Sequence, residues 1–144
     1  MQNWTITRAD DGIATLLFDR PGATTNTLSR EALAELNEAL DVFDRDPPKG
    51  VIVRSGKASG FIAGADITEF GELSNPAGAM ALVKRGWDTF MRVANAPYPT
   101  LALIRGFCLG GGLELSLACR YRVVIDEPGT RLGRQRKGSD DGRH

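Results

Sequence analysis

Residues 106–115 read GFCLGGGLEL and combine three consecutive glycines with a carboxylate two residues later. Gly110, Gly111 and Gly112 carry no side chain, so another group can approach the backbone N–H groups closely. An apolar strand-like run at 101–104 precedes the glycines, and a helix is expected over 113–119. Amides at a helix N-terminus lack intrahelical acceptors, so this turn can stabilise an oxygen that becomes negative during a reaction. The structural alternative is that the glycines only permit a tight turn or close helix packing.

Glu114 is the candidate acid or base of this stretch, because it lies in the first turn of the expected helix. Its neighbours Leu113, Leu115 and Leu117 are apolar, which predicts a semi-buried carboxylate. A carboxylate held away from water suits general acid/base work. The alternative is an acid on a solvated face that interacts favourably with the helix dipole.

A second segment of small residues, FIAGADI at 61–67, could supply the other half of a ligand site. Its small side chains at Ala63, Gly64 and Ala65 let a backbone approach a ligand. The alternative is a plain strand-to-helix connection in which Asp66 caps the next helix.

Composition and residue counts exclude several classes of function. The 144 residues predict one domain. The 18 basic and 18 acidic residues cancel, so we expect no nucleic-acid partner. No apolar run approaches transmembrane length, so we expect no membrane insertion. The only histidine, His144, lies in a polar terminus, so a Ser–His–Asp or Cys–His system has no base. Neither GxGxxG nor GxxxxGK[ST] occurs. Cys108 and Cys119 show no metal-ligand spacing, and Cys108 is expected to be an apolar filler. With no leader or membrane-spanning pattern, a cytoplasmic protein is the default.

Strand and helix patterns alternate along the chain and predict an α/β layer with at least partly parallel strands. A hairpin is expected over 4–8 and 13–19, with its turn at 9–12. Ser29 can cap a helix whose apolar positions recur at helical spacing until Pro47 and Pro48 end it. These apolar positions are Leu33, Leu36, Leu40 and Phe43.

Further elements are a strand over 51–53, a loop over 57–66, a helix over 77–94 and strands over 101–104 and 121–125. One face of the helix over 77–94 is apolar and is expected to be its packing face. Its members are Met80, Val83, Trp87, Phe90 and Ala94.

The last eleven residues, 134–144, contain no apolar side chain and cannot contribute to a core. We therefore predict one folded unit over residues 1–133, followed by a polar tail over 134–144 that is disordered or non-native. A natural flexible terminus is the alternative.

Three segments in order resemble the crotonase, or enoyl-CoA hydratase/isomerase, superfamily. They are SGFIAGADI at 59–67, GFCLGGGLELSLACRYRVV at 106–124, and a loop with RP at 20–21 and NTL at 26–28. The sequence around 61–70 is most similar to the hydratase portion of multifunctional fatty-acid oxidation α subunits. The resemblance covers residues 4–133 and implies the N-terminal part of a crotonase-like α/β fold built from ββα-type units. An unrelated α/β domain with glycine-rich turns is the alternative.

The resemblance implies an enoyl-CoA hydratase that adds water to a 2-enoyl-CoA in fatty-acid β-oxidation. The backbone N–H groups of Ala65 and Gly111 would bind the thioester carbonyl, and Glu114 would position and activate the water. It implies no cofactor and no metal, since coenzyme A is part of the substrate. For a full-length member it implies a homotrimer or a thiolase partner. The implied CoA and substrate contacts are Ala23, Thr25, Ala63, Gly64, Ala65, Asp66, Ile67, Leu109, Gly110, Gly111 and Glu114.

This chain departs from the family pattern at the second glutamate, which in the hydratases stands in a Leu-Gly-Leu-Pro-Glu context. Here Arg131, Leu132 and Gly133 match its start, and Arg136 stands where the glutamate would fall. Arg120 also stands where an aspartate is common. We therefore expect a poor hydratase. The alternatives are a non-catalytic acyl-CoA-binding remnant and an isomerase of 3-enoyl to 2-enoyl thioesters that uses Glu114 alone.

Overall fold

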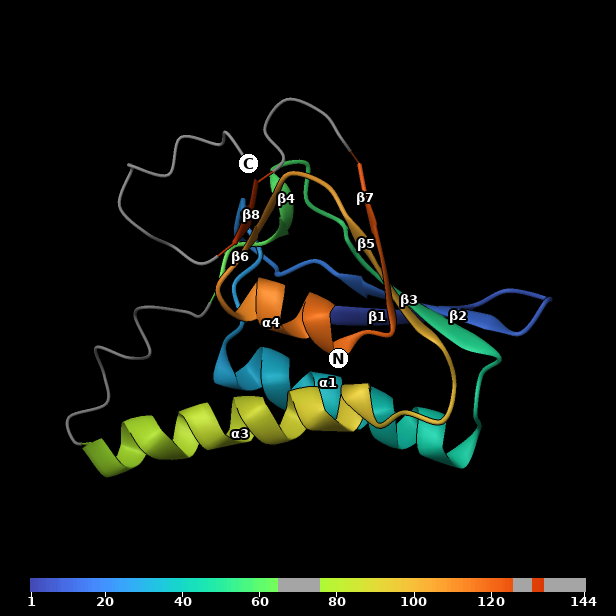
Figure 1. Cartoon of the computed structure of the whole chain (residues 1–144), viewed down its shortest axis with the longest axis horizontal. Helices are drawn as coiled ribbons and strands as arrows, with labels where there is room; N and C mark the ends of the chain where they lie inside the picture. Colours follow the sequence, from blue (N-terminus) through green and yellow to red (C-terminus); the bar gives the residue numbers. More distant parts are fainter. Residues whose placement is uncertain (65–75, 126–130, 134–144) are drawn as a thin grey trace.

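The computed structural model of the chain describes residues 1–64, 76–125 and 131–133. Figure 1 shows their arrangement: two sheets stand above a layer formed by two of the helices, and α4 lies between. The helices are α1 (Arg30–Arg45), α3 (Pro76–Ala94) and α4 (Gly111–Ala118). The larger sheet contains β1 (Trp4–Arg8), β2 (Ile13–Phe18), β3 (Gly50–Ser55), β5 (Thr100–Ile104) and β7 (Tyr121–Val124) in that order. The smaller one orders β4 (Gly60–Ile62), β6 (Phe107–Leu109) and β8 (Arg131–Gly133).

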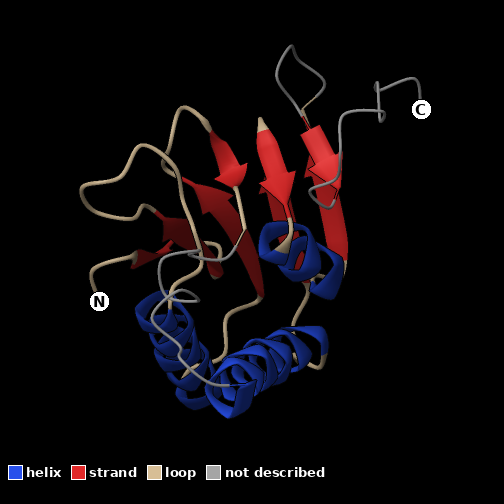
Figure 2. Cartoon of the chain, turned by 90° about the vertical axis from the view of Figure 1, so that its left-hand side faces the viewer, coloured by secondary structure: helices blue, strands red, loops and turns tan. Residues whose placement is uncertain are grey.

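The large sheet confirms the predicted hairpin and the partly parallel α/β layer. Strands β1 and β2 pair antiparallel, and β2, β3, β5 and β7 pair parallel. In the hairpin turn, Ile13 N–H donates to Asp11 Oδ1 over 2.9 Å, and Gly12 has a φ of 89°, which glycine adopts without strain. Figure 2 shows the strands to one side of the helix pair that covers them.

Helix α1 forms as predicted. Ser29 Oγ accepts a hydrogen bond of 3.0 Å from Ala32 N–H, which satisfies one of the free amides of the first turn. The four apolar positions expected to face the core, Leu33, Leu36, Leu40 and Phe43, are all buried.

The apolar face predicted for α3 is exposed at four of its five positions, and only Phe90 is half-buried against the core. Met80 is 66% exposed and Trp87 is 62% exposed, and Val83 and Ala94 are exposed as well. Helix α3 instead buries Thr89 and Val93. Helix α3 contacts both α1 and α4: Asn37 of α1 donates to Thr89 Oγ1 over 2.7 Å, and Val93 joins the hydrophobic core.

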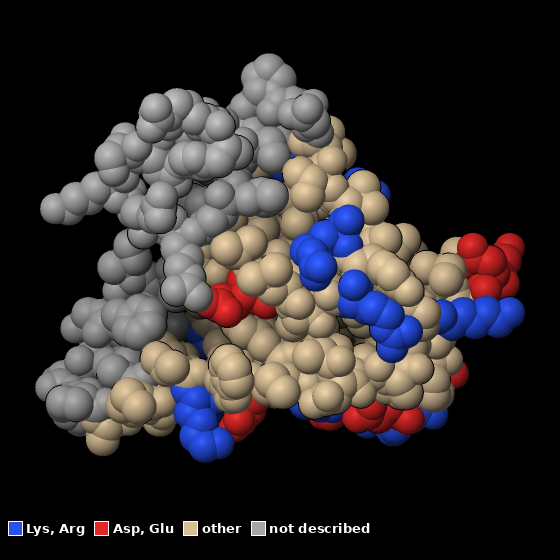
Figure 3. Space-filling model, in the orientation of Figure 1, with Lys and Arg blue, Asp and Glu red and all other residues tan. Residues whose placement is uncertain are grey.

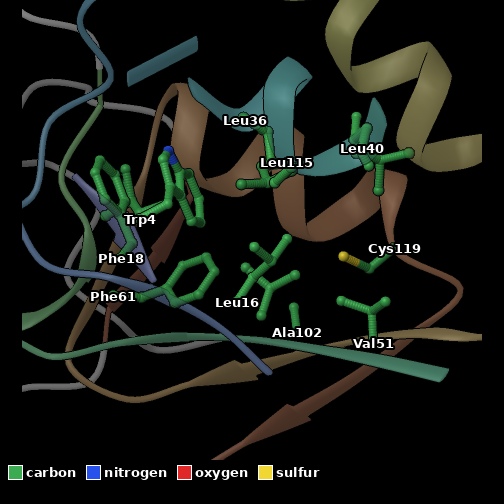
Figure 4. Close-up of a cluster of buried hydrophobic side chains, with 14 of the residues drawn as sticks. Trp4, Leu16, Phe18, Leu36, Leu40, Val51, Phe61, Ala102, Leu115 and Cys119 are labelled. Carbon is green, nitrogen blue, oxygen red and sulfur yellow. The ribbon is translucent and has the colours of Figure 1, made fainter. Parts of the chain in front are cut away.

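The core lies between α1, α4 and the large sheet, and Figure 4 shows its centre. The rings of Trp4 and Phe18 stack with centroids 4.3 Å apart, so the hairpin contributes its largest side chains here. Trp4 Nε1 donates to Ala32 O over 2.9 Å, which ties β1 to α1. Leu115 of α4 reaches the same cluster and is fully buried.

Three strands lie where the sequence predicted none. Residues 57–66 were expected to form a loop, but β4 occupies three of them. Strand β6 occupies 107–109, before the three glycines, and β8 occupies 131–133. Three-residue strands offer too short an alternation to predict. The predicted site residues Ala65, Asp66 and Ile67 and the predicted tail over 134–144 lie outside the described residues. Among the helices of the described ranges, none has the length and apolarity needed to cross a membrane.

Candidate active site

The two glycine-containing segments predicted to form one site lie side by side. Strand β4 pairs parallel with β6, with Gly60 opposite Phe107 and Ile62 opposite Cys108. A Cβ atom on Gly60 would lie 2.3 Å from the backbone nitrogen of Phe107, and Gly60 has a φ of 155°. Only glycine lets the two backbones approach this closely at that point.

The three consecutive glycines continue this contact at the start of α4. A Cβ atom on Gly112 would lie 2.6 Å from the carbonyl oxygen of Ile62, and one on Gly110 would lie 3.5 Å from Gly64 Cα. Close packing, the structural alternative, therefore applies to Gly112. Gly110 is the N-cap of α4 with a φ of 52°, so the amides that follow it open the helix beside Gly64. The first-turn amides of a helix lack intrahelical acceptors and carry partial positive charge.

Glu114 is exposed, so the predicted semi-burial of its carboxylate is wrong for this structure. Helix α4 buries Gly112, Leu115 and Ser116, which share one side of the helix, whereas Glu114 and Leu117 lie on another. Residues adjacent in a helical sequence point in different directions, so apolar neighbours did not predict burial. The backbone N–H of Glu114 donates to Gly110 O over 3.0 Å, which places the residue one turn from the N-terminus of α4.

The loop over 20–28, expected to contact CoA, lies against the same segment. Ala23 and Thr25 are half-buried, and Ser59 Oγ donates to Thr24 O over 2.7 Å. Leu28 N–H donates to Gly64 O over 2.7 Å. The structure therefore brings together Ala63, Gly64, Gly110 and Gly111, and it places the loop that holds Ala23 and Thr25 against Ser59. The roles assigned to them stay predictions.

Cys108 lies beside the glycines but is not suited to nucleophilic catalysis. It is fully buried, and burial raises the pKa of its thiol, which keeps the thiol protonated. Its Sγ lies 3.8 Å from Ser116 Oγ, which lowers that pKa by a smaller amount. Burial also raises the pKa of Cys119 to about 11. The interpretation of Cys108 as an apolar filler is consistent with this environment.

Sequence reasoning gave Asn26 no separate role, although it is 1% exposed and joins several elements around the site. Its side-chain amide contacts Phe18 and Ser55 at the ends of β2 and β3, and Phe61 in the middle of β4. Asparagine in a turn commonly hydrogen-bonds nearby backbone. Asn26 belongs to the NTL segment of the family resemblance, but that segment did not predict a buried side chain.

The face of the molecule in Figure 3 is mostly uncharged, with basic and acidic side chains in small scattered groups. This distribution agrees with the balanced charge of the sequence. Among the described residues on this face, there is no extended basic surface of the kind that attracts a polyanion.

Comparison with known proteins places this arrangement in a family. A family model described as enoyl-CoA hydratase/isomerase matches residues 8–141. Two similar curated proteins are fatty acid oxidation complex subunits alpha. The one from Shewanella frigidimarina is 44% identical over 133 residues and the one from Aliivibrio fischeri is 42% identical over 129 residues. These matches cover 92% and 88% of this chain but 19% of each relative, so the chain spans about a fifth of their length.

Solved structures agree with the sequence matches. An enoyl-CoA hydratase from Mycobacterium smegmatis superposes with a TM-score of 0.79 at 27% identity, over 85% of this chain and 47% of that one. An enoyl-CoA hydratase/carnithine racemase from Magnetospirillum magneticum gives 0.79 at 33% identity, over 86% and 46%. The expected crotonase-like α/β fold, present in part, is thereby confirmed. The chain belongs to the enoyl-CoA hydratase/isomerase family of enzymes.

Proposed function

We propose that this chain carries the carbonyl-binding part of an enoyl-CoA hydratase-type site of fatty-acid β-oxidation. The observation that carries the proposal is the meeting of Gly64 with Gly110 at the N-terminus of α4. The relatives named fatty acid oxidation complex subunit alpha support 2-enoyl-CoA as the substrate class.

In the proposed reaction, the backbone N–H groups of Ala65 and Gly111 donate hydrogen bonds to the thioester carbonyl oxygen. Addition of water across the 2,3 double bond turns the thioester into an enolate, whose oxygen carries a negative charge. Donors fixed in place stabilise this charged oxygen more than they stabilise the neutral carbonyl of the bound substrate. The partial positive charge at the N-terminus of α4 acts in the same direction. The chemistry uses no metal and no cofactor beyond the CoA of the substrate.

Glu114 is the proposed acid/base group for the water. Its position one turn into α4 sets it close in sequence and space to Gly111, and its exposed side chain is accessible to solvent. The family pattern pairs this glutamate with a second one, and Arg136 stands at that place here. We therefore expect slow hydration. Isomerisation of 3-enoyl thioesters, which needs one glutamate, is the alternative reaction.

A non-catalytic acyl-CoA-binding protein is the second candidate function, and the exposure of Glu114 favours it. General acid/base groups act most strongly where water is excluded, because electrostatic interactions are weaker in bulk solvent. The backbone donors could still bind a thioester without turnover.

The test is the loss of 2-enoyl-CoA absorbance with purified, folded chain, alongside Glu114→Gln. Glu38→Gln on α1 is a matched control, because Glu38 is also an exposed helical glutamate. Hydration that Glu114→Gln abolishes and Glu38→Gln retains supports the hydratase proposal. Acyl-CoA binding without turnover of 2-enoyl or 3-enoyl substrates supports the second candidate. A folded chain that does not bind acyl-CoA contradicts both.

A further inference from the structure

A cavity of about 370 Å³ lies at the C-terminal ends of α1 and α3, on different elements from the candidate active site. Figure 1 shows the two helices running in the same direction, with both C-terminal ends on one side of the molecule. The C-terminal halves of the helices and the turn after α3 line the cavity. Its volume is within the range of sites that take small molecules. Leu40, Met91 and Pro97 give it an apolar part.

Tyr98, in the turn after α3, brings a buried hydroxyl to this cavity. The residue is 6% exposed, and its ring packs edge-on against Phe43. The hydroxyl forms no hydrogen bond with any residue in the described ranges. Because every fully inaccessible side-chain nitrogen or oxygen in those ranges has a partner, this hydroxyl must reach the open space of the cavity. Buried tyrosine hydroxyls usually find a partner, so the cavity has a polar group that a ligand can bind.

Two carboxylates at the cavity each keep one oxygen for a ligand. Asp44 Oδ2 accepts a hydrogen bond of 3.0 Å from Arg92, and Asp88 Oδ2 accepts one of 2.7 Å from Lys84. The Oδ1 atoms of Asp44 and Asp88 accept none from the described residues. Together with the Tyr98 hydroxyl they present three oxygen acceptors. A primary ammonium has three N–H donors and no acceptor, so it matches this set.

The helices add a negative potential at the same place. Carbonyl groups at a helix C-terminus carry partial negative charge, and two parallel helices bring two such ends to one cavity. Burial and the nearby Asp44 raise the pKa of Tyr98, and Arg92 lowers it by a smaller amount. The net field of these charges at the hydroxyl therefore favours a positive ligand.

A second cavity limits how many charges the ligand can carry. It has a volume of about 340 Å³, and Asp88 and Arg92 line both cavities. Lys84 and Arg85 also line the second cavity. A ligand with an ammonium at each end would bring its second charge near these basic side chains, and like charges brought together cost binding energy. The fitting ligand therefore has one positive end and an apolar body.

We propose that the cavity between the C-terminal ends of α1 and α3 binds a small organic cation, a primary ammonium on an apolar body. The ammonium donates to Tyr98, Asp44 and Asp88, and the body packs against Leu40 and Met91. This inference is independent of the proposed thioester chemistry, because the candidate active site lies on other elements.

The experiment titrates the full chain at neutral pH with three probes of equal length and follows the methyl resonances of Leu40 and Met91 by NMR. Hexylamine carries one positive charge, 1,6-diaminohexane carries two, and hexan-1-ol carries none. We expect saturable binding of hexylamine with a Kd of about 1 mM, as for a ligand of this size. The diamine should bind about threefold more weakly, because of Lys84 and Arg85, and the alcohol about tenfold more weakly.

Three variants test the assigned oxygens. Tyr98→Phe removes only the hydroxyl and should weaken hexylamine binding about fivefold. Asp44→Asn removes an exposed charge and should weaken binding about threefold; it keeps the test open if Tyr98→Phe does not fold. Asp41→Asn is the matched control, because Asp41 also pairs with Arg92 on α1 but does not line the cavity, and it should leave binding unchanged.

Four results would overturn the inference. Absence of saturation would show that there is no site. Equal binding of hexan-1-ol would reduce the cavity to an apolar surface, and tighter binding of the diamine, or an equal loss in Asp41→Asn, would reduce it to general attraction by acidic side chains. Tighter binding of Nα-acetyl-lysine methylamide than of hexylamine would replace the small cation by a lysine side chain of a protein partner.

Discussion

Helices α1 and α3 pack against each other, but they use their apolar side chains in opposite ways. Helix α1 buries its apolar stripe between α3 and the sheet, and Phe43 is completely inaccessible. Helix α3 leaves Met80, Val83 and Trp87 exposed. It contacts α1 through the polar groups of Thr89 and Arg92 and contributes Val93 to the core. The difference indicates that α1 belongs to the core, whereas α3 forms an outer layer (Figure 1) that reaches the core near its C-terminal end, through Val93.

The largest effect should come from Phe43→Ala. The Phe43 ring packs edge-on against Tyr98 with centroids 5.9 Å apart, and the guanidinium of Arg8 lies 5.5 Å above it. Removing a fully buried ring leaves a cavity, so we expect a loss of about 3–5 kcal/mol in the free energy of unfolding. Urea unfolding followed by circular dichroism measures this loss. A loss smaller than that of Glu35→Gln or Arg92→Ala, two polar variants considered below, would contradict the assignment of α1 to the core.

The fold was predictable where local signals agreed with the tertiary contacts. In α1, the Ser29 cap and the recurring leucines mark both the start of the helix and its buried face. In α3, periodicity located the helix but not its buried face, because that face combines Val93 with Thr89, whose burial depends on Asn37 of α1 and is not indicated by any local pattern of α3. Strand β4 is too short to show alternation, and its existence depends on pairing with a segment far along the chain.

The second effect concerns the buried carboxylate of Glu35, which ties α1 to β1. Burial raises the pKa of Glu35, but hydrogen bonds from Asn3 and Trp4 outweigh it, so the pKa lies below its ordinary value of 4.5. Asn3 N–H and Nδ2 donate to this carboxylate over 2.8 and 2.7 Å. We expect Glu35→Gln to cost about 1.5–3 kcal/mol at neutral pH, as for hydrogen bonds to charged groups.

The pH dependence gives the sign of this effect. A carboxylate with a lowered pKa stabilises the fold above its unfolded pKa, and this contribution is lost as the pH falls through the lower folded value. The stability difference between wild type and Glu35→Gln should therefore shrink below about pH 4.5, as measured by urea unfolding across a pH series. An equally large difference at pH 7 and in acid would contradict this account.

A smaller effect is expected at the polar contact between the helices. Arg92 of α3 donates to Asp41 Oδ1 over 2.9 Å, to Asp44 Oδ2 over 3.0 Å and to Asn37 Oδ1 over 3.0 Å. These groups are partly exposed, so we expect Arg92→Ala to cost about 1 kcal/mol and the cost to fall in high salt. Arg92→Lys keeps the charge but not the planar fork and should recover only part of the loss.

Tyr98 reports on the same contact independently of stability. Burial and the nearby Asp44 raise its pKa, and Arg92 lowers it by a smaller amount. Removing Arg92 should therefore raise the pKa of Tyr98 further, which ultraviolet titration measures, with Tyr98→Phe identifying the signal. A lowered Tyr98 pKa in Arg92→Ala would show that Arg92 does not act on this ring as the geometry indicates.

The candidate site was predictable to the level of its backbone segments. The glycines at 110–112 and the small residues at 63–64 identified two segments that the structure places in contact. Glycine indicates such contacts because it lacks the Cβ atom that would clash where two backbones lie close together. The exposure of Glu114 and the hydrogen bonds of Asn26 were not predictable, since both depend on which neighbours the fold supplies. Short-range pattern indicates where a backbone can approach, and tertiary contacts determine what each polar side chain meets.

The smallest effect should come from Trp87→Ala, the counterpart on α3 of the change at Phe43. Trp87 is 62% exposed, so its removal empties no cavity, and we expect the free energy of unfolding to change by no more than about 0.5 kcal/mol. The chain has two tryptophans, and Trp4 is only 1% exposed. A soluble quencher of tryptophan fluorescence should therefore act almost entirely on Trp87 in the wild type. The quencher should lose most of its effect in Trp87→Ala. Weak quenching in the wild type, or a loss of stability that approaches that of Phe43→Ala, would mean that the exposed stripe of α3 is covered in solution. In that case α3 would be an outer helix only in the single chain, and its exposed apolar stripe would be buried in the form present in solution.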